Sequence, residues 1–172
     1  ERGGDTARPL PADPAWIAFR QRKLTELARR LTEAAHAANP KCLVLLGAET
    51  LNPPPASSEA WAAHPVAAGM LQDWAGWARE GFADWTLLKN FQRDHSQGEE
   101  FFQWIQFAKG LKSPKPWMCG VAGYANFNLG VARQIQRIQA HRLAGVALYH
   151  YERPTIEDRD FLFDSLERSL FG

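Results

Sequence analysis

Side chains that could do chemistry follow directly after short apolar segments in this sequence. In "TLLKNFQRD", residues 86–94, two leucines lead into Lys89, Asn90, Arg93 and Asp94. Other apolar segments are followed in the same way by the polar or aromatic residues Glu49, Tyr124, Asn126, Tyr149 and Tyr151. The carboxylates Glu49 and Asp94 are candidates for acid, base or nucleophilic catalysis. The other residues are candidates for binding a ligand through stacking and hydrogen bonds.

Each candidate also has a purely structural interpretation. Glu49 could cap the next segment or pair with a surface lysine. Arg93 and Asp94 could form a solvated pair in a loop, and Tyr149 and Tyr151 could belong to the core. No HExxH motif or comparable spacing of metal ligands is present, so we expect no metal. A GxSxG nucleophile motif and a glycine-rich phosphate fingerprint are also absent, and we expect no cofactor.

Hydrophobic periodicity predicts an alternation of helices and strands that positions these residues. The proline-, glycine- and charge-rich residues 1–14 are expected to form a lead-in loop. Helices are predicted within residues 13–40, 71–81, 98–112, 128–144 and 156–171, and strands within residues 41–49, 83–91, 116–124 and 145–151.

This alternation predicts an α/β fold. Successive strand-and-helix units require parallel strands joined by right-handed crossovers. Four such units are half of an eight-stranded (β/α)8 TIM barrel, so residues 15–172 are expected to supply its last four βα units, the carboxyl-terminal half. A half barrel leaves the edges of its first and last strands unpaired. We therefore expect an amino-terminal half barrel or a second copy of the chain to close these edges.

The alternation of side chains along a strand predicts which residues face the ligand. In parallel α/β folds the ligand binds at the carboxyl ends of the strands. Lys89 is expected to face the barrel axis, because a lysine under the helix layer would be buried without a partner. Asn90 then lies beside the helices, as a hydrogen-bonding brace. Gly120 and Ala122 are small enough to point inward, which places Tyr124 in the mouth of the barrel.

The overall composition argues against two classes of partner. The chain has 172 residues, 45% of them hydrophobic and 23% charged, with a net charge of +1. A charge so close to zero gives no reason to expect a nucleic acid as partner. No apolar run reaches the roughly 18 residues of a membrane span, so none is expected.

The positions of the two cysteines predict two free thiols. Cys42 is expected to open the first strand and Cys119 to lie in the third. With one strand between them, their Cα atoms should be about 9–10 Å apart. A disulfide requires a separation below about 7 Å.

Several segments of the chain match the pattern of a known family. They are the Trp16-x-x-Phe19-Arg20 pattern, "QDWAGWAREGFAD" (72–84), "TLLKNFQRD" (86–94) and "GVALYHY" (145–151). In these segments the chain resembles the glycosyl-hydrolase-like family 10 domain of bacteria, which is related to the hydrolase domain that cuts poly-N-acetylglucosamine. The likeness runs from about Trp16 to about Leu166 and covers the second half of that domain, strands five to eight of its barrel. Where the family has Pro-Met-Asn-Tyr, this chain has Leu-Lys-Asn-Phe (88–91).

The resemblance implies a glycoside hydrolase domain that is periplasmic or secreted and acts on a bacterial polysaccharide, with amino-sugar polymers among the candidates. It also implies that the family's catalytic acids follow strand four, upstream of these residues. Within the chain, the candidate catalytic carboxylates are Glu49 and Asp94. The candidates for substrate binding are Lys89, Asn90, Arg93, Tyr124, Asn126, Tyr149 and Tyr151. The alternatives are a non-catalytic carbohydrate-binding barrel and a protein-binding domain whose aromatic residues all belong to the core.

Overall fold

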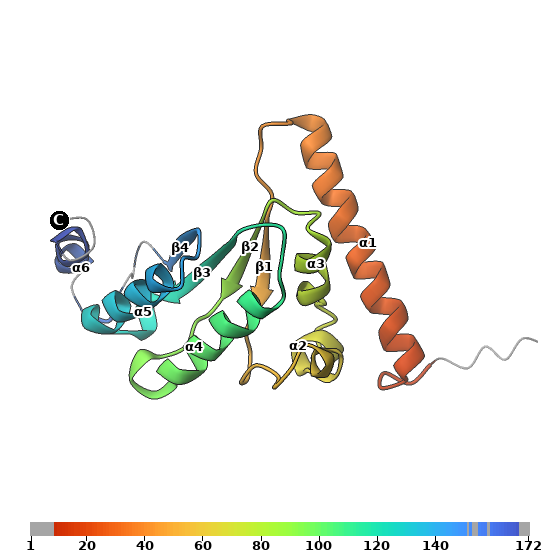
Figure 1. Cartoon of the computed structure of the whole chain (residues 1–172), viewed down its shortest axis with the longest axis horizontal. Coiled ribbons are helices and arrows are strands. Elements are labelled where there is room, and N and C mark those ends of the chain that lie inside the picture. Colours follow the sequence, from red (N-terminus) through yellow and green to blue (C-terminus); the bar gives the residue numbers. More distant parts are fainter. Residues whose placement is uncertain (1–8, 151, 153–154, 158, 169–172) are drawn as a thin grey trace, which may run out of the picture.

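The structure is a computed structural model that describes residues 9–150, 152, 155–157 and 159–168 (Figure 1). The four strands form one parallel sheet in the order β1-β2-β3-β4. The predicted α/β class, with parallel strands and alternating helices, is therefore confirmed. The strands are β1 (Leu45–Glu49), β2 (Trp85–Lys89), β3 (Trp117–Ala122) and β4 (Gly145–Tyr149). The helices are α1 (Pro14–Ala38), α2 (Pro65–Ala68), α3 (Trp74–Glu80), α4 (Asp94–Gly110), α5 (Asn128–Ala140) and α6 (Arg159–Leu166), with 3-10 turns at Glu59–Ala63 and Gly123–Ala125.

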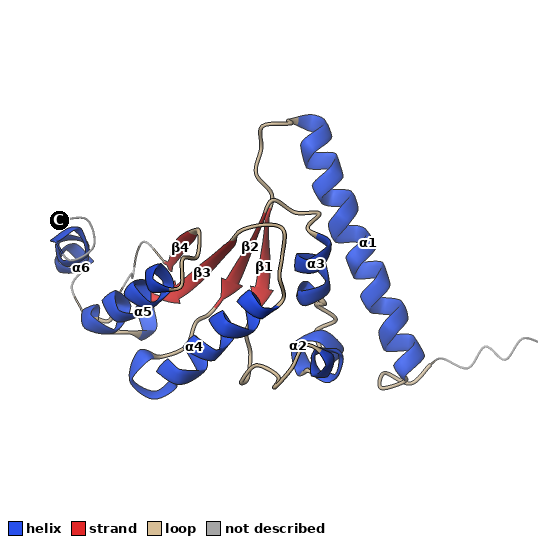
Figure 2. Ribbon diagram, viewed as in Figure 1, coloured by secondary structure: helices blue, strands red, loops and turns tan. Residues whose placement is uncertain are grey.

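One face of the sheet is covered by helices and carries the core. Figure 2 shows α3, α4 and α5 following one side of the sheet, with α1 outside α3. Among the strand residues in the core, Ala48, Leu88, Cys119 and Val121 are fully buried. Large aromatic side chains fill the space between sheet and helices; for example, the ring centroids of Trp61 and Trp74 are 4.5 Å apart. Most of the tryptophans that the sequence contains thus serve packing.

The other face of the sheet carries no helix among the described residues, and we call it the open face. The part of this face near the amino ends of the strands is apolar. Leu45 is 44% exposed there, and a groove of about 350 Å³ is lined by Leu43, Leu45, Trp85, Met118 and Ala144. Parallel sheets are normally buried on both faces. In the part of the chain that the structure describes, β1 pairs only with β2 and β4 only with β3, so both outer edges are free.

Several predicted boundaries differ from the structure. β1 begins at Leu45, so Cys42 precedes the strand instead of opening it. α4 begins at Asp94, four residues before the predicted Gly98, and Gln97 within it has non-helical backbone angles. The 3-10 turn at Glu59–Ala63 and the short helix α2 were not predicted from the sequence. Local periodicity is too weak over four or five residues to reveal such turns.

Both cysteines are free thiols, as predicted. The strand order places β2 between the segments that carry them, which agrees with the reasoning from strand spacing. Cys119 is fully buried, and this burial raises the pKa of its thiol to about 12. The thiol of Cys119 is therefore protonated and chemically inert at neutral pH.

The carboxylate of Asp84 connects the amino ends of β1 and β2 to α1. Oδ2 of Asp84 accepts a hydrogen bond of 2.8 Å from the backbone N–H of Val44, and it lies 2.7 Å from Nε2 of His36 on α1. The backbone N–H of Asp84 in turn donates to the carbonyl of Val44. The N–H of Val44, and next the ring of His36, hold the pKa of the Asp84 carboxyl below its usual value. This carboxylate therefore stabilises the fold more when charged than when protonated.

We predict that Asp84 contributes to the acid sensitivity of folding. Because its pKa is lower in the folded state, its contribution is complete above the ordinary aspartate value of about 3.9 and is lost as the pH falls through the folded value. Asp84→Asn keeps an acceptor for the N–H of Val44 but has no charge to lose. The variant should be less stable than wild type at pH 6, and its urea midpoint should fall less between pH 6 and pH 3. Asp164→Asn, at an exposed position of α6, is the control and should follow the wild type. An equal fall of the urea midpoint between pH 6 and pH 3 in wild type and in Asp84→Asn would contradict this role.

Candidate functional site

An ion pair joins the carboxyl ends of β1 and β2 on the open face. Glu49 and Lys89 are direct neighbours in the parallel register, and Nζ of Lys89 pairs with Oε1 of Glu49. The backbone of both residues is anchored: the Trp74 indole N–H donates to the carbonyl of Glu49 (2.9 Å), and the Thr50 hydroxyl donates to the carbonyl of Lys89 (2.8 Å). The predicted orientation of Lys89, away from the helix layer, is supported by its partial exposure and by the stem lying over Gly47.

Four aromatic rings continue this polar pair across β3 and β4. The ammonium of Lys89 lies 5.9 Å from the ring centroid of Phe91, which is 5.3 Å from the ring of Tyr149. Tyr149 contacts the rings of Tyr124 and His150, at 6.2 Å and 5.4 Å. Tyr149 is 54% exposed and Tyr124 39% exposed. We call this group the carboxyl-edge patch; its members are Glu49, Lys89, Phe91, Tyr124, Tyr149 and His150.

Two members of the patch were not among the predicted site residues. Phe91 lies two residues after Lys89, and this shared parity was the signal that could have identified it. His150 follows Tyr149 and has the opposite parity within the strand, so alternation alone could not have placed its ring beside Tyr124. The rings lie close together partly because Gly120 has no side chain. A Cβ at Gly120 would lie 2.9 Å from Cε1 of Phe91 and 3.1 Å from the carbonyl of Leu88.

Asn90 and Asn126, predicted to bind substrate, are buried instead. Asn90 is fully buried, and its amide donates a hydrogen bond of 2.8 Å to the carbonyl of Phe101 on α4. This contact confirms Asn90 as a brace against the helices. Asn126 is 1% exposed, and its amide bonds only to backbone among the described residues. Neither side chain reaches the patch, because each amide is turned to the helix side or to the loops.

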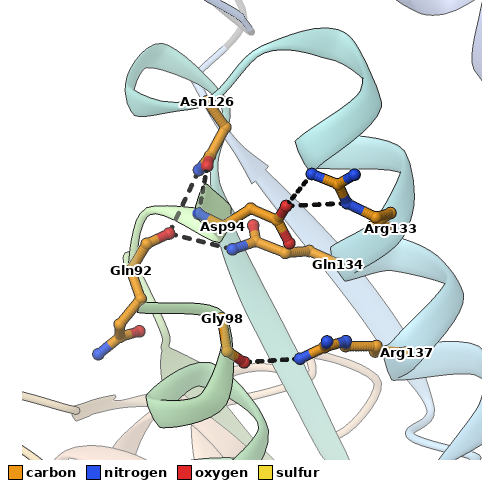
Figure 3. Close-up of polar contacts among 7 residues, drawn as sticks. All are labelled: Gln92, Asp94, Gly98, Asn126, Arg133, Gln134 and Arg137. Carbon is orange, nitrogen blue, oxygen red and sulfur yellow. Dashed lines mark hydrogen bonds and ion pairs between the residues drawn. The ribbon is translucent and has the colours of Figure 1, made fainter. Parts of the chain in front are cut away.

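Asn126 links three loops at the carboxyl edge, and Figure 3 shows its bonds to Asp94 and Gln92 in the segment after β2. Its Oδ1 accepts from the N–H of Asp94 (2.7 Å), and its Nδ2 donates to the carbonyls of Ala122 (2.8 Å) and Gln92 (3.2 Å). Its own carbonyl accepts from the hydroxyl of Thr155 (3.0 Å), in the segment that follows β4. One residue therefore ties the loops after β2, β3 and β4 together.

Gln92 extends the same connections to the loop after β1. Its Nε2 donates to the carbonyl of Thr50 (2.9 Å), and its own carbonyl also accepts from Nε2 of Gln134 on α5 (3.0 Å). Thr50, Gln92, Asn126 and Thr155 are all buried. We call these four residues the loop network. It holds the loops that follow all four strands, and with them the residues of the patch.

The predicted catalytic residue Asp94 lies in a different environment from Glu49. Its carboxylate pairs with the guanidinium of Arg133 on α5, with Nε of Arg133 at 2.9 Å, and its side chain is only 7% exposed (Figure 3). Asp94 thus joins α4 to α5, and the structure does not bring it together with Glu49. Arg93, a predicted binding residue, is exposed at the start of α4. Tyr151 lies outside the described residues.

The chemistry available at the patch is therefore binding by one charged pair and several rings. Glu49 is the one predicted catalytic carboxylate that lies in it. Among the described residues, no group of three or more histidine, cysteine, aspartate or glutamate side chains could hold a metal ion. None of the described helices combines the length and the apolar character needed to cross a bilayer.

We predict that Asn126→Ala strongly destabilises the protein. It leaves the N–H of Asp94 and the carbonyls of Ala122 and Gln92 without this partner, and the expected cost is about 2–4 kcal/mol in the free energy of unfolding, measured with urea. Asn128→Ala is the matched control, because Asn128 is also buried but its amide has no hydrogen-bond partner among the described residues. Its cost should stay below about 1 kcal/mol. Equal losses in the two variants would show that the loop network does not depend on Asn126.

Comparison with known proteins assigns no family to this chain. No family model, no curated protein and no solved structure matches it. The resemblance to the glycosyl-hydrolase-like family 10 domain rests on the sequence motifs alone.

Proposed function

We propose that the carboxyl-edge patch binds a carbohydrate. The observation that carries the proposal is the exposure of Tyr149 and Tyr124 beside a pair of charged groups at the carboxyl ends of parallel strands. Exposed tyrosine rings offer flat apolar surfaces to the C–H faces of a sugar, and each has a hydroxyl that can bond to the ligand. Glu49 and Lys89 supply an acceptor and a donor for sugar hydroxyl groups. Carboxyl ends of strands are also where parallel α/β folds bind their ligands.

Hydrolysis of a polysaccharide is the second candidate function, and it is favoured by the position of Glu49 in the patch. Glycosidases use two carboxylates, roughly 5–10 Å apart depending on the mechanism. Asp94, the other predicted catalytic carboxylate, is paired with Arg133 on α5 and is not a member of the patch. The carboxyl-edge patch contains no carboxylate besides Glu49, so the second one would come from outside the patch. The motif resemblance supports a bacterial polysaccharide, including amino-sugar polymers, as substrate and an extracytoplasmic location for the protein.

We predict that Tyr149→Ala weakens binding of neutral oligosaccharides about tenfold, because a stacking surface worth about 1.4 kcal/mol is lost. The measurement is isothermal titration with N-acetylglucosamine and glucose tetramers. Phe19→Ala on α1 is the control, since Phe19 is a similarly exposed ring (41%) outside the patch. Unchanged affinity in Tyr149→Ala, with intact near-ultraviolet circular dichroism, would contradict the proposed site. Release of reducing ends that depends on Glu49 would identify hydrolysis.

We also propose that the sheet is one half of an eight-stranded barrel, completed by an amino-terminal half or by a second copy. The free edges of β1 and β4 and the exposed apolar groove on the open face support this proposal. In a (β/α)8 barrel each strand is followed by one helix. Because α1 precedes β1 and α6 follows β4, a second copy would bring α6 of one chain and α1 of the other to the same junction. An amino-terminal half with four strands and three helices avoids this crowding.

We predict that the isolated chain does not persist as a dilute monomer. Its free edges and its exposed groove should cause association, so light scattering should give a mass above 19.3 kDa that rises with concentration. A discrete mass of twice that value would indicate a second copy, and a continuous rise would indicate a missing half. Leu45→Lys in the groove should reduce association, whereas Leu27→Lys, at an exposed position of α1, should not. A stable monomer at all concentrations would count against the half barrel.

A further inference from the structure

We propose that the Glu49–Lys89 pair selects uncharged sugars over acidic and basic ones, and that each member cancels the charge preference of the other. This inference rests on the proposed carbohydrate site and specifies its class of ligand, a neutral oligosaccharide.

The position of the pair makes it part of any ligand surface at the patch. Glu49 and Lys89 sit at the carboxyl ends of adjacent strands, with side chains 18% and 37% exposed. Lys89 also faces the ring of Phe91, and Phe91 contacts the exposed ring of Tyr149. A sugar stacked on Tyr149 and extending toward β1 would therefore reach the two head groups.

The pair leaves hydrogen-bonding capacity for a neutral ligand. A carboxylate has a second oxygen, and an ammonium has three protons of which the pair uses one. Neither head group has another hydrogen-bond partner within the described residues. Two neighbouring sugar hydroxyl groups can bind here together, one donating to Glu49 and the other accepting from Lys89.

The pair opposes a ligand with a net charge. A carboxylate on the sugar that approaches Lys89 is repelled by Glu49, because the two head groups are in contact. An ammonium on the sugar that approaches Glu49 is repelled by Lys89 in the same way. The other ion pair at this edge, Asp94 with Arg133, is also internally neutral and is turned toward α5. The pair thus offers donors and acceptors but has no net charge.

Removing one partner should reveal the charge of the other. The probes are tetramers of glucose (neutral), of galacturonic acid (acidic) and of glucosamine at pH 5.5 (basic), measured by titration at low salt so that charge effects are not screened. Wild type should bind the neutral tetramer about tenfold more tightly than either charged one. Glu49→Gln should gain about tenfold for the acidic tetramer, and Lys89→Met about tenfold for the basic one. Lys89→Met keeps an apolar stem of similar length over Gly47 and beside Phe91.

Two controls separate charge from shape and from folding. The double variant Glu49→Gln/Lys89→Met has neither charge and should return to the neutral preference of wild type. Arg30→Gln removes an exposed cation of α1, outside the patch, and should leave the order of affinities unchanged. Tighter binding of the acidic tetramer by wild type, or no gain in Glu49→Gln, overturns the inference while the carbohydrate site stands. Failure of wild type to bind any tetramer, or binding that does not depend on Tyr149, overturns both.

Discussion

The buried amide of Asn126 joins the loop after β2 to the end of β3, because its oxygen accepts from the N–H of Asp94 and its nitrogen donates to the carbonyls of Gln92 and Ala122. A primary amide has donors and an acceptor on one small planar group, so it can satisfy both kinds of buried backbone group. Leucine or alanine at this position would remove the partner of the Asp94 N–H and one of the two donors to the carbonyl of Gln92. Two further hydrogen bonds extend these connections. Gln92 donates to the carbonyl of Thr50 after β1, and Thr155 after β4 donates to the carbonyl of Asn126. The carboxyl edge therefore depends on polar contacts, whereas the layer beneath it depends on apolar packing.

The alternation of side chains along β2 separates residues of the helix-covered face from residues of the carboxyl-edge patch. Leu88 and Asn90 point to the helices, where one packs and the other bonds to α4. Lys89 has the opposite parity and, with Phe91, joins the partly exposed patch. A shift of one residue in the strand register would exchange these two sets, burying a lysine and exposing a leucine. The hydrogen bonds from Thr50 to Lys89 and from Gln92 to Thr50 fix the register at the carboxyl ends of β1 and β2, where Lys89 would otherwise become buried.

The sequence predicted the parts of the molecule that depend on periodicity. Alternating helices and apolar runs predicted the order of elements and the parallel sheet, and parity predicted the orientation of Lys89 and Asn90. The partners of polar side chains could not be predicted in this way. Asp94 pairs with a residue 39 positions later, and Asn126 meets loops that only the folded sheet brings together. Such contacts depend on three-dimensional geometry, and no local pattern in the chain records them. The same limit explains why His150 was missed.

The order of the strands in the sheet follows their order in the chain, and this has a consequence for synthesis. Each strand pairs with the one made just before it, so no pairing in the described sheet spans more than one crossover. A chain of this kind can build its sheet progressively from β1 as it leaves the ribosome. The bond from Thr155 to Asn126 involves a segment made after β4. The hydrogen bond from Thr155, which connects the segment after β4 to the loop after β3, therefore forms only after β1 to β4 have all been synthesised.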